Sequence, residues 1–156
     1  GRIKEYADKF GCKFYKGNPW KIKCDIALPC ATQNELNKED AKQLIKNGCF
    51  CVSEGANMPC SPDAISVFQK ANILYAPGKA SNAGGVATSV LEMSQNSLKT
   101  YWAAEEVDQK LKDIMSKIHE SCFEYGRQGN YTDYVKGANI SAFLKIADSM
   151  IDQGIV

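Results

Sequence analysis

A short loop of small and polar residues contains the side chains best suited to contact a charged ligand. Residues 77–89 read PGKASNAGGVATS, in which Asn82 and two glycines precede a helical segment expected to start at Val86. Free N–H groups and the positive end of a helix dipole suit a carboxylate or phosphate at such a place. Val86 and Ser89 are three residues apart, so an aliphatic wall and a hydroxyl donor share one helix face. A glycine pair that only forms a tight turn is the alternative.

Two more loops of small and amide residues follow apolar runs of the chain. The run 24–29 leads into CATQN at 30–34, and the run 49–53 leads into EGAN at 54–57. Since the carboxyl ends of parallel strands lie along one edge of an open sheet, we expect these loops and the loop at 77–89 to share one rim. A plain turn or cap role for Asn57 is the alternative.

The elements that must position these loops alternate between strand and helix. We expect strands at 13–15, 24–29, 49–53 and 73–76, and helices at 3–10, 37–47 and 61–71, capped by Asn37 or Asn34 and by Ser61 ahead of Pro62. This order predicts βαβ units, an α/β fold with a partial Rossmann-like parallel sheet and flanking helices. The consecutive apolar residues of 26–28 and 73–75 predict strands covered on both faces.

The character of the chain changes after residue 89, where we expect no further strands. Apolar residues spaced by three and four predict helices over 107–122 and 140–151, and the Gly- and Asn-rich residues 125–133 predict a surface loop between them. We therefore divide the chain into residues 1–89, the sheet part, and residues 90–156, the C-terminal helices.

Composition excludes several classes of partner. There are 19 Lys and Arg against 18 Asp and Glu, with no basic run interleaved with aromatics, which disfavours nucleic acid and anionic membranes. No apolar stretch approaches the roughly 20 residues needed to span a bilayer. The seven cysteines form no CxxC pair, and the one histidine, His119, disfavours a metal site and reads as structural. We expect a soluble, cytoplasmic protein with reduced cysteines. We expect the Lys79 side chain to be a solvated charge without a specific role.

A complete dinucleotide site is not expected in this chain. No strand is followed by G-x-G-x-x-G, and no Walker sequence occurs. The first residue is Gly1 and a helical segment follows almost at once, which suggests a piece of a longer protein.

Four ordered motifs resemble the hexameric glutamate dehydrogenases, most closely the NADP-type enzymes. They are CDIALPCATQNEL at 24–36, EGANMP at 54–59, the loop at 77–89 with LEMSQN at 91–96, and GANI at 137–140. The resemblance covers essentially residues 24–156, about the carboxyl-terminal third of the family's chain. It makes residues 1–89 the later part of a dinucleotide-binding domain, and residues 90–156 the helices that lead back toward a substrate domain.

The resemblance implies reversible oxidative deamination of L-glutamate to 2-oxoglutarate and ammonia, with NADP as coenzyme and NAD not excluded. The family's catalytic lysine and aspartate lie earlier in its chain, so no catalytic residue is expected here. The isolated chain should be inactive, and the full-length protein should form a homo-hexamer.

The resemblance also implies roles for six residues. Ser89 matches the serine that hydrogen-bonds the side-chain carboxylate of glutamate, Val86 matches a wall of the same pocket, and Asn82 matches an asparagine near substrate and nicotinamide. On the coenzyme side, Asn57 and the pair Ala31 and Thr32 match positions near the nicotinamide ribose and carboxamide.

Two other readings remain open at this point. The chain could be a self-standing half-sheet module for binding or interaction, although an open sheet edge would then need protection. It could instead belong to a dehydrogenase of another amino acid, such as leucine or phenylalanine. Ser89 disfavours an apolar side chain, because the hydroxyl would be left unpaired.

Overall fold

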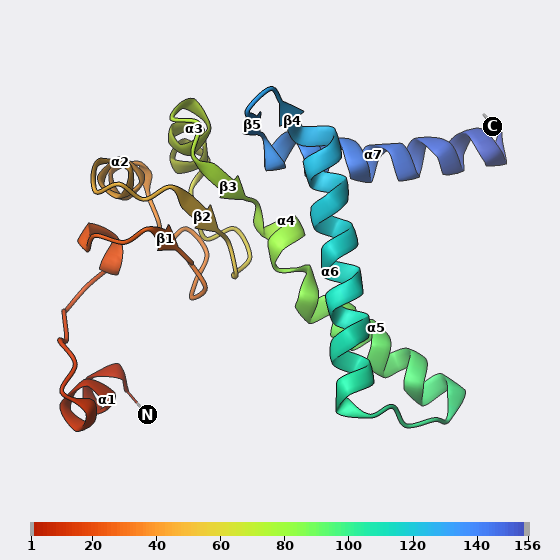
Figure 1. Cartoon of the computed structure of the whole chain (residues 1–156), viewed down its shortest axis with the longest axis horizontal. Helices are drawn as coiled ribbons and strands as arrows, with labels where there is room; N and C mark the ends of the chain where they lie inside the picture. The colour runs from red at the N-terminus through yellow and green to blue at the C-terminus, as the bar shows by residue number, and fades with distance from the viewer. Residues whose placement is uncertain (1, 155–156) are drawn as a thin grey trace.

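The computed structural model describes residues 2–154, and its elements fall into a sheet part and a helical part (Figure 1). The first part runs from α1 through the strands to β3, and the second comprises the helices from α4 onward. The bounds are α1 Ile3–Phe10, the 3-10 helix η1 Pro19–Lys21, β1 Ile26–Ala27, α2 Lys38–Lys46, β2 Cys51–Ser53, α3 Pro62–Lys70, β3 Leu74–Ala76, α4 Gly78–Ser81, α5 Ala83–Leu98, α6 Ala104–Gly126, β4 Arg127–Gln128, β5 Tyr131–Thr132 and α7 Tyr134–Gln153.

The sheet has three parallel strands in the order β1-β2-β3, so the predicted α/β fold is confirmed. Ala27 pairs with Val52, and Val52 pairs with Tyr75, which places these three side chains in one row. The strand expected at 13–15 is wrong. Phe14 and Tyr15 are exposed there, and no strand among residues 2–154 supplies the hydrogen bonds that a β-rich triplet needs.

Helices α2 and α3 cover one face of the sheet, as their sequence signals predict. The Asn37 side chain accepts hydrogen bonds from the first turn of α2, and Ser61 caps α3 ahead of a proline at its first position. Leu44 and Phe68 project from these helices onto the row of strand residues. The resulting core fixes the strand ends from which the candidate ligand loops emerge.

The opposite face of the sheet is open, so the expectation that both faces are covered is wrong for this chain. Ile26 and Leu28 are 51% and 60% exposed, and Leu74 is 41% exposed. A consecutive apolar run predicts cover on both faces, but the described residues supply a layer of helices on one face only. The neighbouring helix α6 reaches this face only beside β2 and β3.

The helical part confirms two amphipathic helices and corrects one detail. Residues 127–132 form a small antiparallel hairpin of β4 and β5 where a loop without strands was expected. Two glycines allow α6 and α7 to meet closely: a Cβ on Gly137 would collide with the Cys122 carbonyl, and one on Gly126 with the Asp133 carbonyl.

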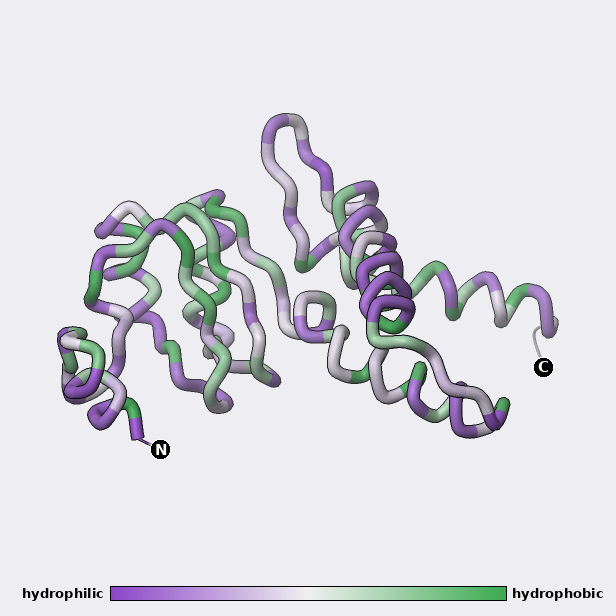
Figure 2. The backbone as a smooth tube through the Cα atoms, turned by 60° about the horizontal axis from the view of Figure 1, so that its bottom comes forward, coloured by the Kyte–Doolittle hydropathy of each residue, from purple (hydrophilic) through white to green (hydrophobic). Residues whose placement is uncertain are grey.

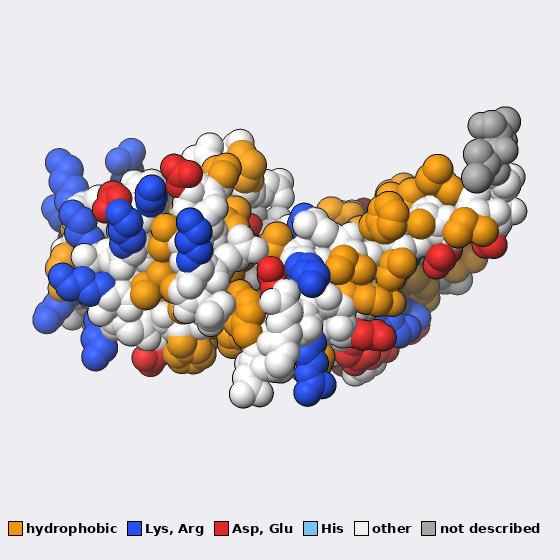
Figure 3. Space-filling model, turned by 90° about the horizontal axis from the view of Figure 1, so that it is seen from above, with side chains coloured by type: hydrophobic (Ala, Val, Ile, Leu, Met, Phe, Trp, Pro, Cys, Tyr) orange, Lys and Arg blue, Asp and Glu red, His pale blue; other side chains and the backbone are white. Residues whose placement is uncertain are grey.

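Helix α7 continues beyond this contact as an arm whose residues alternate between hydrophobic and hydrophilic (Figure 2). Hydrophobic side chains gather on the arm in Figure 3, and Phe143, Met150 and Ile151 are each more than 60% exposed. The predicted helix is therefore present, but its apolar stripe has little cover from the described residues.

Candidate functional site

A cleft of about 740 Å³ lies between the strand-end loops and helix α5. Five of the six residues singled out from the sequence line it, namely Ala31, Asn57, Asn82, Val86 and Ser89. The other lining residues are Cys30, Gln33, Gly55, Ala56, Gly85, Val90 and Met93. The prediction that three loops share one rim is confirmed.

Thr32 is the predicted residue that does not line this cleft. Its N–H lies 3.4 Å from the Glu35 side-chain oxygen Oε1, which also accepts a 2.8 Å hydrogen bond from the Ala31 N–H. The loop therefore folds back on Glu35, which leaves Ala31 rather than Thr32 at the cleft wall.

The second and third loops are joined by their amide side chains. Asn82 Nδ2 donates to Asn57 Oδ1 at 2.8 Å and to the Ala56 carbonyl at 3.1 Å. The second loop is also tied to the segment between β1 and the first loop, because the N–H groups of Gly55 and Ala56 both donate to the Pro29 carbonyl. Backbone and side-chain hydrogen bonds thus fix the relative positions of all three loops.

Helix α5 starts earlier than the sequence suggested. It begins at Ala83, so Gly84 and Gly85 lie inside its first turn and do not precede the helix. A short helix, α4, comes directly before it, with Asn82 as the residue between the two. The start of the helix is therefore three residues earlier than expected, and the N–H groups that a helix start leaves without intrahelical partners belong to residues 83–86. Of these, the Gly85 N–H lies 3.4 Å from the Asn82 carbonyl.

Gly85 leaves an open patch of wall in the cleft. A Cβ on Gly85 would meet no heavy atom within 4 Å, so nothing in local packing requires glycine there. The missing side chain instead enlarges the space in front of Ser89, one turn further along α5. The Ser89 hydroxyl donates to the Gly85 carbonyl at 3.2 Å. The Ser89 side chain is part of the cleft lining.

One side of the cleft is a face of helix α5, of which the sequence predicts only Val86 and Ser89. Val86, Ser89, Val90 and Met93 occupy positions i, i+3, i+4 and i+7 of α5. Extending the same spacing beyond Ser89 would have found the last two. Cys30 and Gln33 belong to the first candidate ligand loop, but no feature of the sequence distinguishes them from their neighbours.

The chemistry available in the cleft is recognition rather than proton transfer. Its lining contains no Asp, Glu, Lys, Arg or His, and its polar side chains are three neutral amides, the Ser89 hydroxyl and the Cys30 thiol. Amides and hydroxyls orient a polar ligand and satisfy its hydrogen bonds. General acid and base groups must therefore come from elsewhere if a reaction takes place here.

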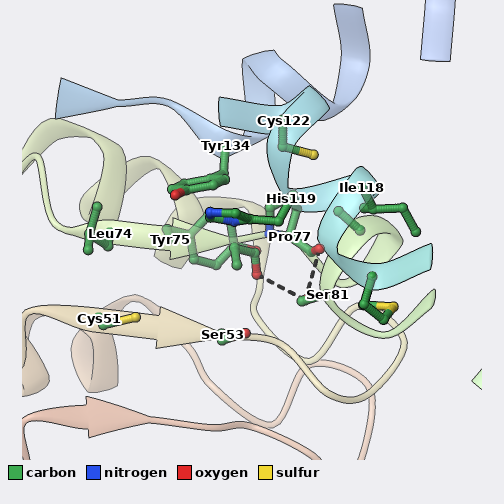
Figure 4. A pocket seen from close by; sticks show the side chains of 13 residues that line it. Cys51, Ser53, Leu74, Tyr75, Pro77, Ser81, Ile118, His119, Cys122 and Tyr134 are labelled. Carbon is green, nitrogen blue, oxygen red and sulfur yellow. Dashed lines mark hydrogen bonds between the residues drawn. The ribbon is translucent and has the colours of Figure 1, made fainter. Parts of the chain in front are cut away.

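A second cavity, of about 370 Å³, lies between the open face of the sheet and helix α6 (Figure 4). The His119 ring stacks on the Tyr134 ring with centroids 5.6 Å apart, and the Cys122 side chain lies beside them. Burial raises the pKa of the Tyr134 hydroxyl and of the Cys122 thiol, which keeps both neutral. The lining is mostly apolar, and the predicted structural role of His119 agrees with this packing.

Two other kinds of feature are absent from residues 2–154. No group of three or more His, Cys, Asp or Glu residues in that range is arranged to hold a metal ion. Within the same residues, no helix is long and apolar enough to cross a membrane.

The protein has an α/β fold with a three-stranded parallel sheet and a cleft at the strand-end loops, and comparison with known proteins identifies its family. The model of the Glutamate/Leucine/Phenylalanine/Valine dehydrogenase family matches residues 1–154. The chain belongs to this family.

Individual relatives narrow the similarity to glutamate dehydrogenases. The chain is 63% identical over 158 residues to the glutamate dehydrogenase of Bacteroides thetaiotaomicron, covering 100% of this chain and 36% of the relative. It is 57% identical to the NAD-specific enzyme of Bacteroides fragilis and 54% identical to the NADP-specific enzyme of Escherichia coli, covering 99% and 100% of this chain and 35% of each relative.

A solved structure agrees with the fold. The crystal structure of Plasmodium falciparum glutamate dehydrogenase superimposes with a TM-score of 0.92 at 50% identity, over 100% of this chain and 34% of that one. The chain thus spans about a third of the length of its relatives.

Proposed function

We propose that this chain is part of a glutamate dehydrogenase, which catalyses the reversible oxidative deamination of L-glutamate to 2-oxoglutarate and ammonia. The observation that supports this most directly is the cleft, where five of the six residues implied by the family resemblance come together. Membership of the family and the similarity to glutamate-specific relatives agree with the proposal.

Ser89, Val86 and Asn82 form the proposed substrate side of the cleft. The Ser89 hydroxyl can turn from the Gly85 carbonyl to donate to the side-chain carboxylate of glutamate, and the open space at Gly85 gives that carboxylate room. The exposed Val86 side chain packs against the aliphatic part of the substrate. A Ser89 hydroxyl that donates to the substrate carboxylate favours glutamate over aliphatic amino acids, which have no group to accept this hydrogen bond.

Ala31, Asn57 and Asn82 form the proposed coenzyme side of the cleft, and Thr32, also proposed to lie near the coenzyme, is in the same loop as Ala31 but outside the cleft lining. The residues present fit the nicotinamide end of a dinucleotide, because small side chains line the cleft beside two amides able to pair with a carboxamide or ribose. When bound, the coenzyme accepts the hydride from the substrate carbon. NADP is the proposed coenzyme and NAD is the alternative, since similar relatives are specific for one or the other.

The groups that move protons are proposed to lie outside this chain. The cleft lining contains no carboxylate or lysine, so its own residues orient the substrate and leave acid and base catalysis to a lysine and an aspartate of the complete subunit. We further propose a homo-hexamer for that subunit. A cytoplasmic location is supported by the seven cysteines, all of which are free thiols.

The test is an assay of the complete subunit with L-glutamate and either NADP⁺ or NAD⁺, followed by the absorbance of the reduced coenzyme. The proposal expects glutamate-dependent reduction that runs in reverse with 2-oxoglutarate and ammonium. Turnover of leucine, phenylalanine or valine in preference to glutamate would contradict it.

A further inference from the structure

Glu54 is a buried carboxylate that joins the two loops bearing the amide side chains of the cleft. It follows directly after β2 and is only 4% exposed. Its oxygen Oε2 accepts a 2.6 Å hydrogen bond from the N–H of Gly78, the first residue of α4, and Oε1 accepts a 3.2 Å bond from the Cys60 N–H. The carboxylate therefore bridges positions 24 residues ahead and 6 residues ahead in the sequence.

The backbone of Glu54 is tied to the same third loop. Its N–H donates to the Ala76 carbonyl at 3.1 Å, and its carbonyl accepts a 2.6 Å bond from the Ser81 hydroxyl. Both the main chain and the side chain of one residue thus hold the segment from the end of β3 to the residue before Asn82.

The Gly78 Cα is tightly packed beside the Glu54 carboxylate, with no room for a side chain. A Cβ added to Gly78 would lie 3.0 Å from Glu54 Oε2, 2.9 Å from the Ala56 carbonyl oxygen and 3.5 Å from Asn82 Nδ2. The carboxylate, the second loop and the Asn82 amide therefore meet at one point. Any displacement of Gly78 moves Asn82, because Asn82 lies one turn of chain further on and its N–H bonds to the Gly78 carbonyl.

We propose that Glu54 is a positioning residue for the reaction of this cleft, an inference that rests on the proposed glutamate dehydrogenase function. Glu54 does not line the cleft itself. It acts through the Gly78 and Cys60 N–H groups, which set the separation of Asn82 and Asn57 and hence the place where nicotinamide and substrate meet.

A carboxylate is required because two N–H donors converge on the side chain. Each of its oxygens accepts from one donor. Glutamine has the same shape but offers one oxygen and one NH₂ group, so one of the two N–H groups would face another donor in a buried place. Glu54→Gln therefore preserves volume while breaking one side of the bridge.

The experiment compares Glu54→Gln with Asp40→Asn in the complete subunit. Asp40 accepts a 3.2 Å bond from the Asn37 N–H at the start of α2 and does not line the cleft, so its variant controls for lost stability alone. Two quantities are measured: kcat/KM for glutamate, and deuterium exchange of peptides covering residues 58–61 and 77–82.

We expect Glu54→Gln to raise exchange in the peptide whose N–H loses its acceptor, either 58–61 or 77–82, and to lower kcat/KM by about tenfold or more, because small misplacements of positioned groups are costly to rate. Asp40→Asn should leave both quantities near wild type. Unchanged exchange in Glu54→Gln overturns the proposal, and so does raised exchange with kcat/KM within twofold of the control. If the wild type does not oxidise glutamate, the proposed function fails, and the exchange measurement alone decides whether Glu54 fixes the two loops.

Discussion

The side-chain amide of Asn82 donates a 2.8 Å hydrogen bond to the side-chain oxygen of Asn57, joining two loops that lie 25 residues apart. The same amide reaches the Ala56 carbonyl, so Asn82 makes two bonds to one neighbouring loop. This small network determines the shape of the cleft on the side proposed for the coenzyme.

Replacing Asn82 by Asp should therefore destabilise the chain. The new carboxylate would face the Ala56 carbonyl, an acceptor, with no donor between them, and Asn57 would have to rotate its amide to offer its NH₂ group. The expected loss is about 1–3 kcal/mol in the free energy of unfolding, measured by urea denaturation. Asn96→Asp, at an exposed position near the end of α5, the helix that follows Asn82, is the control and should cost under about 1 kcal/mol. Equal losses in the two variants would show that the amide network has no special role.

The crossing of α6 and α7 should be intolerant of side chains. Gly137→Ala would drive a Cβ into the Cys122 carbonyl, a rigid backbone group, and should cost about 1–3 kcal/mol by overpacking. Gly84→Ala is the matched control: its Cβ would lie 3.7 Å from Leu111 Cδ1 and Met115 Sδ, which is ordinary contact. The free energy of unfolding of the Gly84→Ala variant should rise by up to about 1 kcal/mol, because alanine has a higher helix propensity than glycine. Thermal unfolding of both distinguishes the positions, and a tolerated Gly137→Ala would contradict the crossing described here.

The cysteines should differ sharply in reactivity toward iodoacetamide at pH 8. Cys30 is exposed in the cleft and Cys12 is exposed far from it in sequence, whereas Cys60 is fully buried. Burial raises the pKa of the Cys60 thiol far above its usual range, and the nearby charge of Glu54 adds to this, so Cys60 should remain unmodified in the folded protein.

The same reaction tests the coenzyme side of the cleft. In the complete subunit, saturating coenzyme should slow alkylation of Cys30, measured by mass spectrometry of the labelled peptides, while Cys12 reports the unprotected rate. Protection of both cysteines to the same degree, or of neither, would argue against coenzyme beside Cys30.

The purified 156-residue chain should not oxidise glutamate at a rate above the blank. Its cleft lining supplies hydrogen bonds but no acid or base, and ground-state contacts alone give little transition-state stabilisation. Coenzyme reduction followed by absorbance, with bovine serum albumin as a blank protein, measures this. Glutamate-dependent reduction by the chain would mean that proton-transfer groups are present in it.

Sequence reasoning located the rim of the sheet because local signals agreed there. Asn37 and Ser61 fix the starts of α2 and α3, and the parallel strands that alternate with these helices must then end on one edge. Five predicted residues line the cleft for this reason.

The errors have equally local causes. Residues 13–15 have strand composition but no pairing partner, and tertiary pairing decides whether such a triplet becomes a strand. The start of α5 was placed three residues late because glycine disfavours helix interiors, whereas α4 and Asn82 already support the turn that contains Gly84 and Gly85. The division between residues 89 and 90 stays a prediction; α5 runs across it. The bridge made by Glu54 joins distant segments and has no sequence signal.

The most direct test of the central claim is the change in kcat/KM caused by Ser89→Ala in the complete subunit, measured with L-glutamate and with norvaline, which lacks the side-chain carboxylate. If the Ser89 hydroxyl binds that carboxylate, glutamate should lose about tenfold or more, as expected for a hydrogen bond to a charged group worth about 1.5–3 kcal/mol, while norvaline changes little. An equal effect on both amino acids would contradict the assignment of this cleft to the glutamate side chain.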